Sequence, residues 1–333
     1  MATPPPPSLA HEEVDPVIIS VLSVGLAAGL LAALHFSVNC RAVRVPTLTE
    51  VAGTIACFNG STSSNPIRQA SLACFRLVIL AWFLVVDVYH LLEEPFLGGP
   101  KPKHPLFFFT VWNFNLQVLF FAVAFFASAA HLLRGACPWQ PAICGATHRL
   151  FSICLPSSLL VALIEWTLLF PNDTTDDQQA ADLSVTSFTA HGINAFALLI
   201  ELFVNQMVVR PAHLVYPLAW ASAYVVFTWI QQQTFGGVWP YFFMPLDTYV
   251  AFGWYALVFV AYLLAYALTV GLSQLKARLS GLEIDGPALG CAQAARDLLS
   301  VLPTAAAEAF LPPALEEPKA KAHTSSLLVE PMP

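Results

Sequence analysis

Charged side chains are scarce in this sequence. Only 11% of its 333 residues are Asp, Glu, Lys or Arg, against about 25% in an average soluble domain. Lys and Arg number 14 in all, and the formal net charge is −7. Binding to nucleic acid needs a basic patch that meets the phosphates, so a nucleic-acid partner is not expected. With 57% hydrophobic residues, the composition is that of an integral membrane protein with membrane lipids as its surroundings.

The local signatures of common soluble enzymes are missing as well. The sequence has no Gly-rich phosphate loop, no GxSxG elbow, no HExxH and no zinc spacing among its Cys and His residues. No resident cofactor or metal is therefore predicted. Any chemistry has to come from polar side chains inside the membrane.

Seven apolar stretches predict an all-α polytopic protein, a bundle of about seven transmembrane helices. Each is roughly 20 to 29 residues long, which suits a bilayer core of about 30 Å. Residues 1–16 are rich in proline and acidic, and predict a disordered N-terminus, whereas residues 276–333 predict a mostly disordered tail. The predicted helices cover residues 17–39, 70–92, 105–133, 150–170, 184–205, 214–233 and 247–275, with loops at 134–149 and 171–183 among the connections.

Basic residues are concentrated on one side of this seven-helix arrangement. The positive-inside rule then places the N-terminus outside and the tail in the cytosol. The sequence does not distinguish a plasma membrane from an endomembrane. The seven cysteines lie in or near the cytosolic side, where thiols stay reduced. The basic residues of that side are Arg41, Arg44, Arg68, Arg134, Arg149, Arg210, Lys276 and Arg278.

The fifth stretch, 184–205, carries a polar face in an otherwise apolar helix. At 100° per residue, His191, Asn194, Glu201 and Asn205 fall within about an 80° arc. Such a face is costly in hydrocarbon unless it meets partners or a wet cavity, which makes it a candidate functional surface. Polar contacts that hold helices together would give the same pattern.

Two more helices are striped in the same way. Arg76, Asp87 and His90 share a face of the second stretch, and Thr110, Asn113, Gln117, Ser128 and His131 share a face of the third. In the predicted orientation, Thr110 and His191 both lie roughly 7 to 9 Å below the outer surface. Asp87, His90, Glu165 and Gln231 fall in the same layer. A polar pocket opening to the outer leaflet would explain this shared depth, as would a polar layer without a ligand.

The residue types at that depth suit acyl transfer. A threonine hydroxyl is a poor nucleophile unless a base takes its proton, and a neutral histidine is the usual base at neutral pH. Thr110 is then the nucleophile and His191 the general base and acid. The oxyanion would be stabilised by Asn113, Asn194 or a glutamine. Either Asp87 or Glu165 could orient the imidazole, and the spacing does not choose between them.

Two alternative hypotheses, a metal site and a haem site, use the same histidines. His90 and His191 with a carboxylate would form a zinc site, and His90–His191 with His131–His213 would ligate two haems. A signalling receptor and a transporter also fit a multi-pass layout, but no motif supports either. Gly25, Gly29 and Ala33 form a small-residue face suited to close helix packing, within the chain or in a homo-oligomer.

Parts of the sequence resemble the Rolling stone family of multi-pass membrane proteins, which is related to the androgen-induced gene and androgen-dependent TFPI-regulating proteins. The resemblance covers about 200 residues, and the first helix and the tail lie outside it. It rests on the run Phe109–Trp112 and on His191, Asn194, Glu201, Arg210, His213, Tyr216, Pro217, Tyr224, Phe227, Thr228, Pro245, Leu246 and Asp247.

The resemblance implies different functions for the two branches. The androgen-induced branch consists of membrane hydrolases of fatty acid esters of hydroxy fatty acids, whose threonine and histidine would be Thr110 and His191. The Rolling stone branch is associated with myoblast fusion. Asn194 and the Arg-Pro-x-His turn are more similar to this second branch, and Met244 and Thr248 depart from both. The sequence therefore predicts a lipid ester hydrolase, with a non-catalytic membrane interaction or fusion protein as the alternative.

Overall fold

The computed structural model describes residues 16–39, 54–55, 62–63, 66–92, 105–133, 140–172, 176–234 and 239–280. Within these ranges six helical stretches are long and apolar enough to cross a bilayer, and α1 is a further apolar helix. The predicted fold class is confirmed, and the chain is a multi-pass integral membrane protein. The long helices are α1 (Pro16–Asn39), α3 (Pro66–Leu92), α4 (Phe109–Leu132), α5 (Gln140–Ile164), α8 (Asn194–Val204), α9 (Val215–Thr234) and α10 (Val250–Leu279).

Short elements link the long helices. Two strands, β1 (Thr54–Ile55) and β2 (Thr62–Ser63), pair antiparallel, with Thr54 opposite Ser63. Two π-helical turns continue neighbouring α-helices: η2 follows α5, and η4 joins α7 to α8. The remaining short elements are η1 (Pro105–Phe107), η2 (Glu165–Leu169), η3 (Phe170–Asn172), α6 (Asp176–Asp182), α7 (Val185–Phe188), η4 (Thr189–Ile193) and η5 (Pro211–Leu214).

Two predicted loops are wrong in part. Residues 140–149 belong to α5. Pro141 is well suited to the first turn of a helix, and polar side chains in the turns that follow form hydrogen bonds within the bundle. The His148 imidazole Nε2 lies 3.0 Å from the Val208 carbonyl oxygen. The acidic loop at 171–183 contains α6. The predicted N-terminus before residue 16 and the tail beyond residue 280 lie outside the described residues.

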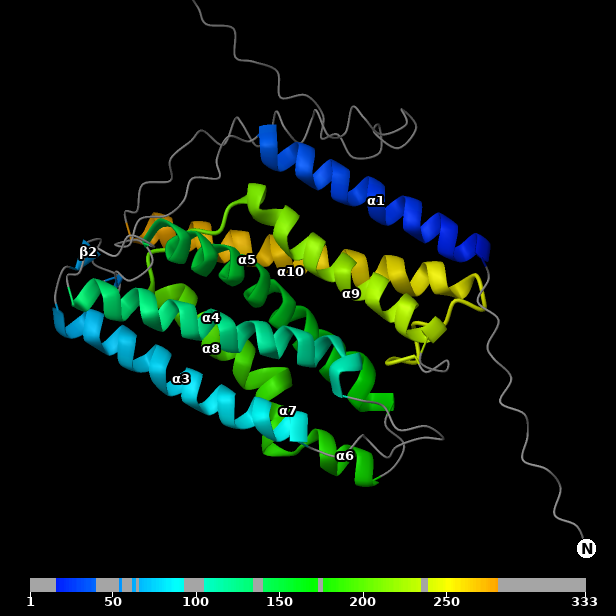
Figure 1. Cartoon of the computed structure of the whole chain (residues 1–333), viewed down its shortest axis with the longest axis horizontal. Coiled ribbons are helices and arrows are strands. Elements are labelled where there is room, and N and C mark those ends of the chain that lie inside the picture. Colours follow the sequence, from blue (N-terminus) through cyan, green and yellow to red (C-terminus); the bar gives the residue numbers. More distant parts are fainter. Residues whose placement is uncertain are drawn as a thin grey trace, which may run out of the picture.

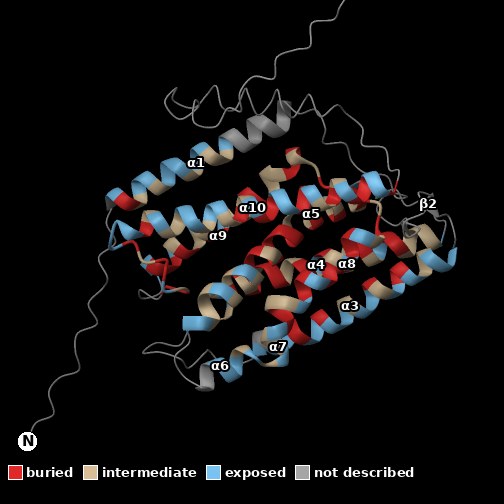
Figure 2. Cartoon of the chain, turned by 180° about the vertical axis from the view of Figure 1, so that it is seen from behind, coloured by how far each residue is buried: buried red, intermediate tan, exposed pale blue. Residues whose placement is uncertain are grey.

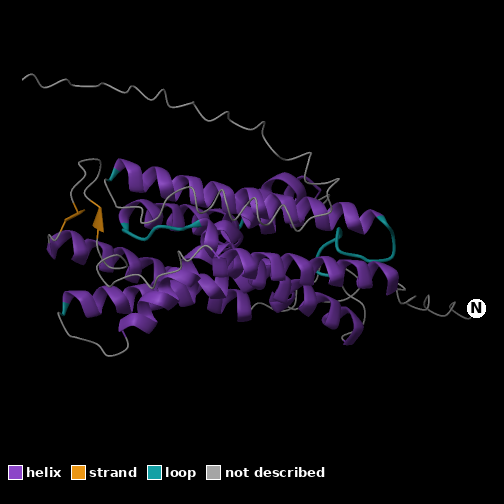
Figure 3. Cartoon of the chain, turned by 90° about the horizontal axis from the view of Figure 1, so that it is seen from above, coloured by secondary structure: helices purple, strands orange, loops and turns teal. Residues whose placement is uncertain are grey.

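The helices run up and down through one bundle (Figure 1). α4 packs between α3 and α5, and α5 also packs against α8, α9 and α10. α1 lies at the periphery, where it contacts α9 and η5. Burial is concentrated in the middle of the bundle, whereas α1 is exposed along much of its length (Figure 2). Figure 3 shows the same helices from above, aligned along one direction.

We name the two ends of the bundle by a residue at each. At the Thr110 end, the Tyr224 hydroxyl of α9 donates to the Phe107 carbonyl oxygen at 2.9 Å, which ties the second half of α9 to the start of α4. At the Lys276 end, the last turns of α10 meet the segment after α8. Which end faces the cytosol stays a prediction.

The apolar core has two parts. One lies between α3, α4, α5 and α8 and is rich in phenylalanine; the rings of Phe83 and Phe114, for example, lie 4.9 Å apart. The other lies between α1, α5, α9 and α10 and is rich in tryptophan and tyrosine. Ile18 anchors the start of α1 in this second cluster, where only 1% of it is exposed.

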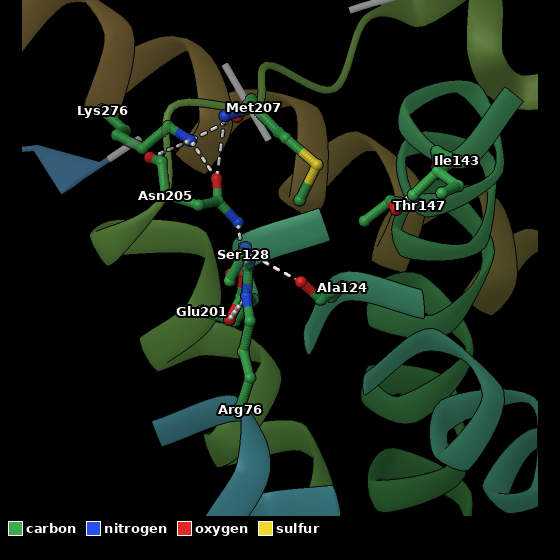
Figure 4. A network of polar contacts seen from close by, with 9 residues as sticks. All are labelled: Arg76, Ala124, Ser128, Ile143, Thr147, Glu201, Asn205, Met207 and Lys276. Carbon is green, nitrogen blue, oxygen red and sulfur yellow. Dashed lines mark hydrogen bonds and ion pairs between the residues drawn. The ribbon is translucent and has the colours of Figure 1, made fainter. Parts of the chain in front are cut away.

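A fully buried ion pair connects α3 to α8 (Figure 4). Arg76 and Glu201 are both 0% exposed, and Arg76 Nη2 lies 2.5 Å from Glu201 Oε1. Arg76 Nη1 also donates to the Ala124 carbonyl oxygen at 3.0 Å and to Ser128 Oγ at 2.6 Å, on α4. Three helices are thus joined by one guanidinium, whose buried charge is offset by a carboxylate and two further acceptors.

The polar network continues to α10. The Asn205 amide donates to Glu201 Oε1 at 3.0 Å, and Asn205 Oδ1 accepts from Lys276 Nζ at 3.2 Å. Lys276 also donates to the Met207 carbonyl oxygen and is 2% exposed. Lys276 was predicted as a cytosolic charge beyond the last span. In the structure, α10 continues to Leu279 and carries Lys276 into the bundle, where carbonyl and amide oxygens satisfy it.

Replacing Arg76 with alanine should lower the free energy of unfolding by about 3–5 kcal/mol, because Glu201 would stay buried without its partner. Replacing the pair together, as Arg76→Met with Glu201→Leu, should cost less than the single change. Arg68→Ala, at an exposed position of α3, is the matched control and should change stability by less than about 0.5 kcal/mol. Thermal unfolding in detergent measures all three. Equal losses in the single and double variants would contradict this account.

Candidate functional site

A cavity of about 600 Å³ lies between α1 and the α5, α9 and α10 side of the bundle. Its volume falls within the roughly 300–1,000 Å³ that is usual for small-molecule sites. Most of its wall is aliphatic or aromatic: α1 contributes Val21 and Leu26, and α10 contributes Phe252 and Tyr262. An apolar cavity inside a membrane protein suits an apolar ligand.

Polar groups gather at the Thr110 end of this cavity. Thr110, Glu165 and Tyr241 all line it. The Tyr241 hydroxyl accepts from the Phe109 backbone N–H at 3.0 Å and also interacts with the Thr110 side chain. Burial raises the pKa of Tyr241, with the nearby Glu165 adding to the effect, so its hydroxyl is neutral at neutral pH and can donate.

His191 contacts Glu165, which lines the cavity. His191 Nε2 lies 3.4 Å from Glu165 Oε2, and Glu165 is only 5% exposed. His191 itself is not among the described residues that line the cavity. Thr110 thus lines the same cavity as Glu165, and Glu165 pairs with His191. Of the two acids considered for orienting the imidazole, it is Glu165 that makes the contact.

The other ring nitrogen of His191 is anchored by Ser187. His191 Nδ1 lies 2.9 Å from the Ser187 carbonyl oxygen and 3.0 Å from Ser187 Oγ. A protonated Nδ1 donates to the carbonyl oxygen, and an unprotonated Nδ1 accepts from the hydroxyl, so Ser187 offers a partner in either state. Nε2 faces the Glu165 carboxylate.

Both members of this pair lie in π-helical turns. Glu165 opens η2, and His191 is at the centre of η4. A π-turn inserts one residue into an α-helix, rotates the side chains around it and leaves backbone groups without their usual partners; such turns are frequent at functional sites. Here the two insertions turn a glutamate and a histidine toward each other.

Asn194 and Trp166 satisfy the backbone groups that the η4 turn leaves open. The Asn194 backbone N–H donates to the Thr189 carbonyl, five residues back, so the Ala190 carbonyl loses its α-helical partner. The Asn194 side chain takes that place, donating to the Ala190 carbonyl at 2.7 Å and accepting from the Ala195 N–H at 2.7 Å.

The His191 carbonyl therefore loses its usual donor, the Ala195 N–H, and accepts instead from Trp166 Nε1 at 3.0 Å. Trp166 lies in η2, so this bond ties the two π-turns together. Asn194, considered above as an oxyanion donor, has its amide committed to the backbone of its own helix.

The remaining polar stripes serve other parts of the bundle. Gln117 Nε2 donates to Ser158 Oγ at 2.9 Å, and Asn113 Nδ2 lies 3.5 Å from the same oxygen, so both amides join α4 to α5. His213 Nδ1 accepts from the Arg210 N–H at 3.3 Å. Across the described residues, no group of three or more His, Cys, Asp or Glu could hold a metal ion, and the His90 side chain is outside them.

The small-residue face of α1 does not pack closely against another described helix of the same chain at Gly25 or Gly29, and packing between copies stays a prediction. Gly25 and Gly29 line the cavity, and a Cβ built on either would meet no described atom within 4 Å outside its own helix. The side chain of Ala33 lies outside the described residues. Tyr241 is the site residue that sequence reasoning missed, since it lies in a loop, where helical periodicity gives no signal.

Comparison of the chain with protein-family models, with curated proteins and with solved structures finds no match. The assignment of a multi-pass membrane protein accordingly rests on its apolar helices, and the proposed function rests on the site itself.

Replacing Asn194 with leucine should destabilise the protein by about 2–4 kcal/mol, because two buried backbone groups would lose their partners. Asn115→Leu is the matched control. The Asn115 amide also donates to a carbonyl four residues back, that of Val111, but within a regular helix, so its removal should cost less than about 1 kcal/mol. Thermal unfolding of the two purified variants measures the difference. Equal costs would mean that Asn194 does not support the π-turn.

Proposed function

We propose that this protein is an intramembrane hydrolase of lipid esters, with Thr110 as its nucleophile. The observation that carries the proposal is that Thr110 and Glu165 line one apolar cavity while Glu165 pairs with His191. An acyl chain would occupy the apolar part of the cavity, which leaves its ester group at the polar end. The resemblance to the androgen-induced branch supports Thr110 as the nucleophile. The base role expected of His191 passes to Glu165 in this proposal, because Glu165 lines the cavity and His191 pairs with it.

In the first half of the reaction, Thr110 Oγ1 bonds to the ester carbonyl carbon. The Glu165 carboxylate accepts the proton that the Thr110 hydroxyl loses. The carbonyl oxygen becomes an oxyanion, which the neutral Tyr241 hydroxyl stabilises by donating a hydrogen bond. The tetrahedral intermediate then collapses, the bond to the alcohol oxygen breaks, and Glu165 returns the proton to the leaving alcohol. Thr110 is left acylated.

In the second half, water attacks the acyl group and gives a proton to Glu165. The bond to Thr110 Oγ1 breaks, the proton returns to Thr110, and a fatty acid is released. His191 acts through Glu165: its imidazole ring, anchored by Ser187, holds the carboxylate in place.

Turnover of a fluorogenic umbelliferyl fatty acyl ester by the purified full chain in lipid nanodiscs tests this function. Thr110→Ala should abolish turnover, and Glu165→Gln should reduce kcat by about 10²–10⁴-fold, the usual share of a general base. His191→Gln should also reduce kcat with little change in KM, because His191 does not line the cavity. Thr110→Ser, which keeps a hydroxyl, should retain part of the activity.

Thr167→Ala is the matched control for these changes. Thr167 is an exposed threonine of η2 whose hydroxyl donates to the Leu163 carbonyl oxygen at 2.6 Å, so its loss should leave turnover intact. Undiminished hydrolysis by a folded Thr110→Ala protein would contradict the assignment of the nucleophile. A wild-type protein that binds fatty acyl esters without hydrolysing them would favour the non-catalytic alternative.

A further inference from the structure

The cavity beside α1 is too large and too apolar to be ordinary packing space. Val21 and Gly25 in its α1 wall are exposed, so the cavity is open to the surroundings of the bundle and is not an enclosed void. Apolar walls also give water few hydrogen-bonding partners. A cavity of about 600 Å³ with this lining is therefore space for an apolar ligand.

The cavity is elongated along the helices. The residues of α10 that line it extend from Phe252 to Tyr262, and those of α9 from Leu218 to Trp229. At 1.5 Å per residue, each range corresponds to a depth of about 15 Å. Thr110, Glu165 and Tyr241 belong to the Thr110 end, where the head of a lipid would lie, and the apolar tail would extend along the helices past Ser222 and Tyr262.

α1 forms one wall of the cavity. Two glycines in this wall leave space that larger side chains would fill. Six residues of α1 line the cavity, from Val21 to Leu30, and they include Gly25 and Gly29. A Cβ at either glycine would meet no described atom within 4 Å outside its own helix. Since α1 begins at the Thr110 end, Gly25 lies about 6 Å deeper than Val21, and Gly29 about 12 Å deeper.

We propose that Gly25 and Gly29 determine how long an acyl chain this cavity accepts. The chain runs along the glycine face of α1, from the polar group at the Thr110 end toward the middle of the bundle. A larger side chain at Gly29 would close only the far end, whereas the same side chain at Gly25 would close the cavity about one helical turn nearer its polar end. The inference rests on the acyl ligand of the proposed function and adds α1 as the element that selects it.

Photo-crosslinking with fatty acids that carry a diazirine and an alkyne tests this selection without any turnover. The probes are hexanoyl, decanoyl and myristoyl chains, chosen to match the depths of the two glycines and applied to the full chain in lipid nanodiscs with the Thr110→Ala change as background. We expect Gly29→Leu to reduce capture of the myristoyl probe by about tenfold, since each methylene that loses its buried site costs a factor of about four in affinity. Gly25→Leu should reduce capture of the decanoyl probe as well. The hexanoyl probe should bind to both variants.

Ala27→Leu is the matched control. Ala27 is exposed on the opposite face of α1 and does not line the cavity, so its leucine variant should capture all three probes as the unchanged background does. If a leucine variant does not fold, Gly25→Ala and Gly29→Ala should give the same order of chain lengths with smaller changes. Capture that is unchanged at every length in both glycine variants, or reduced equally at every length, would overturn the inference.

Together with the umbelliferyl ester assay, the capture experiment separates this inference from the proposed enzyme. A length-dependent loss of capture together with no hydrolysis by the wild type would overturn the hydrolase and support the acyl-chain selection. Hydrolysis that depends on Thr110 with no effect of either glycine on chain length would overturn the selection alone. Failure of the background protein to capture any of the three probes would overturn it as well.

Discussion

The structure depends on one constraint of the bilayer: a polar group away from water needs a partner within the protein. At the Lys276 end, this requirement is met within the bundle. The Arg76–Glu201 pair, extended by Asn205 to Lys276, joins α3, α4, α8 and α10 through charge-assisted hydrogen bonds. Removing one partner would leave a buried charge, so these groups fix how the helices pack.

At the Thr110 end, the polar groups instead surround a cavity. Two π-turns rotate Glu165 and His191 into contact, and the displaced backbone groups of η4 are bonded by Asn194 and Trp166. Here some backbone hydrogen bonds of the regular α-helix are replaced by hydrogen bonds to side chains. Irregular turns of this kind are frequent at functional sites. The two ends of one polar face thus differ in kind: one holds the bundle together, and the other faces a ligand space.

Helical periodicity predicted the fold and part of the site. The apolar lengths identified the helices, and the 100° rule placed Asn194, Glu201 and Asn205 on one buried face. The π-turns could not be predicted, because their one-residue insertions follow from tertiary contacts between η2 and η4. Periodicity also fixes the height of a side chain but not its rotation toward a neighbour, which left Asp87 and Glu165 equivalent until the structure showed the Glu165–His191 contact.

The lack of close packing at Gly25 and Gly29 within the described part of the chain could not be predicted for a related reason. Glycines four residues apart permit either close helix packing or open space, and only the positions of the surrounding helices decide between the two. Lys276 was placed in solvent because a lysine at the end of a transmembrane helix usually extends toward water. Here the carbonyl oxygens of the chain after α8 offer it an internal site.

The central claim is that Thr110 is an activated nucleophile at the end of a lipid cavity. Its most direct test is to treat membranes containing the full chain with a fluorophosphonate that carries an alkyl chain, and to map the adduct by peptide mass spectrometry. The account predicts a phosphonylated Thr110 in the wild type, with labelling lost in Thr110→Ala and strongly reduced in Glu165→Gln. A folded wild-type protein that binds the alkyl chain but forms no adduct at Thr110 would contradict it.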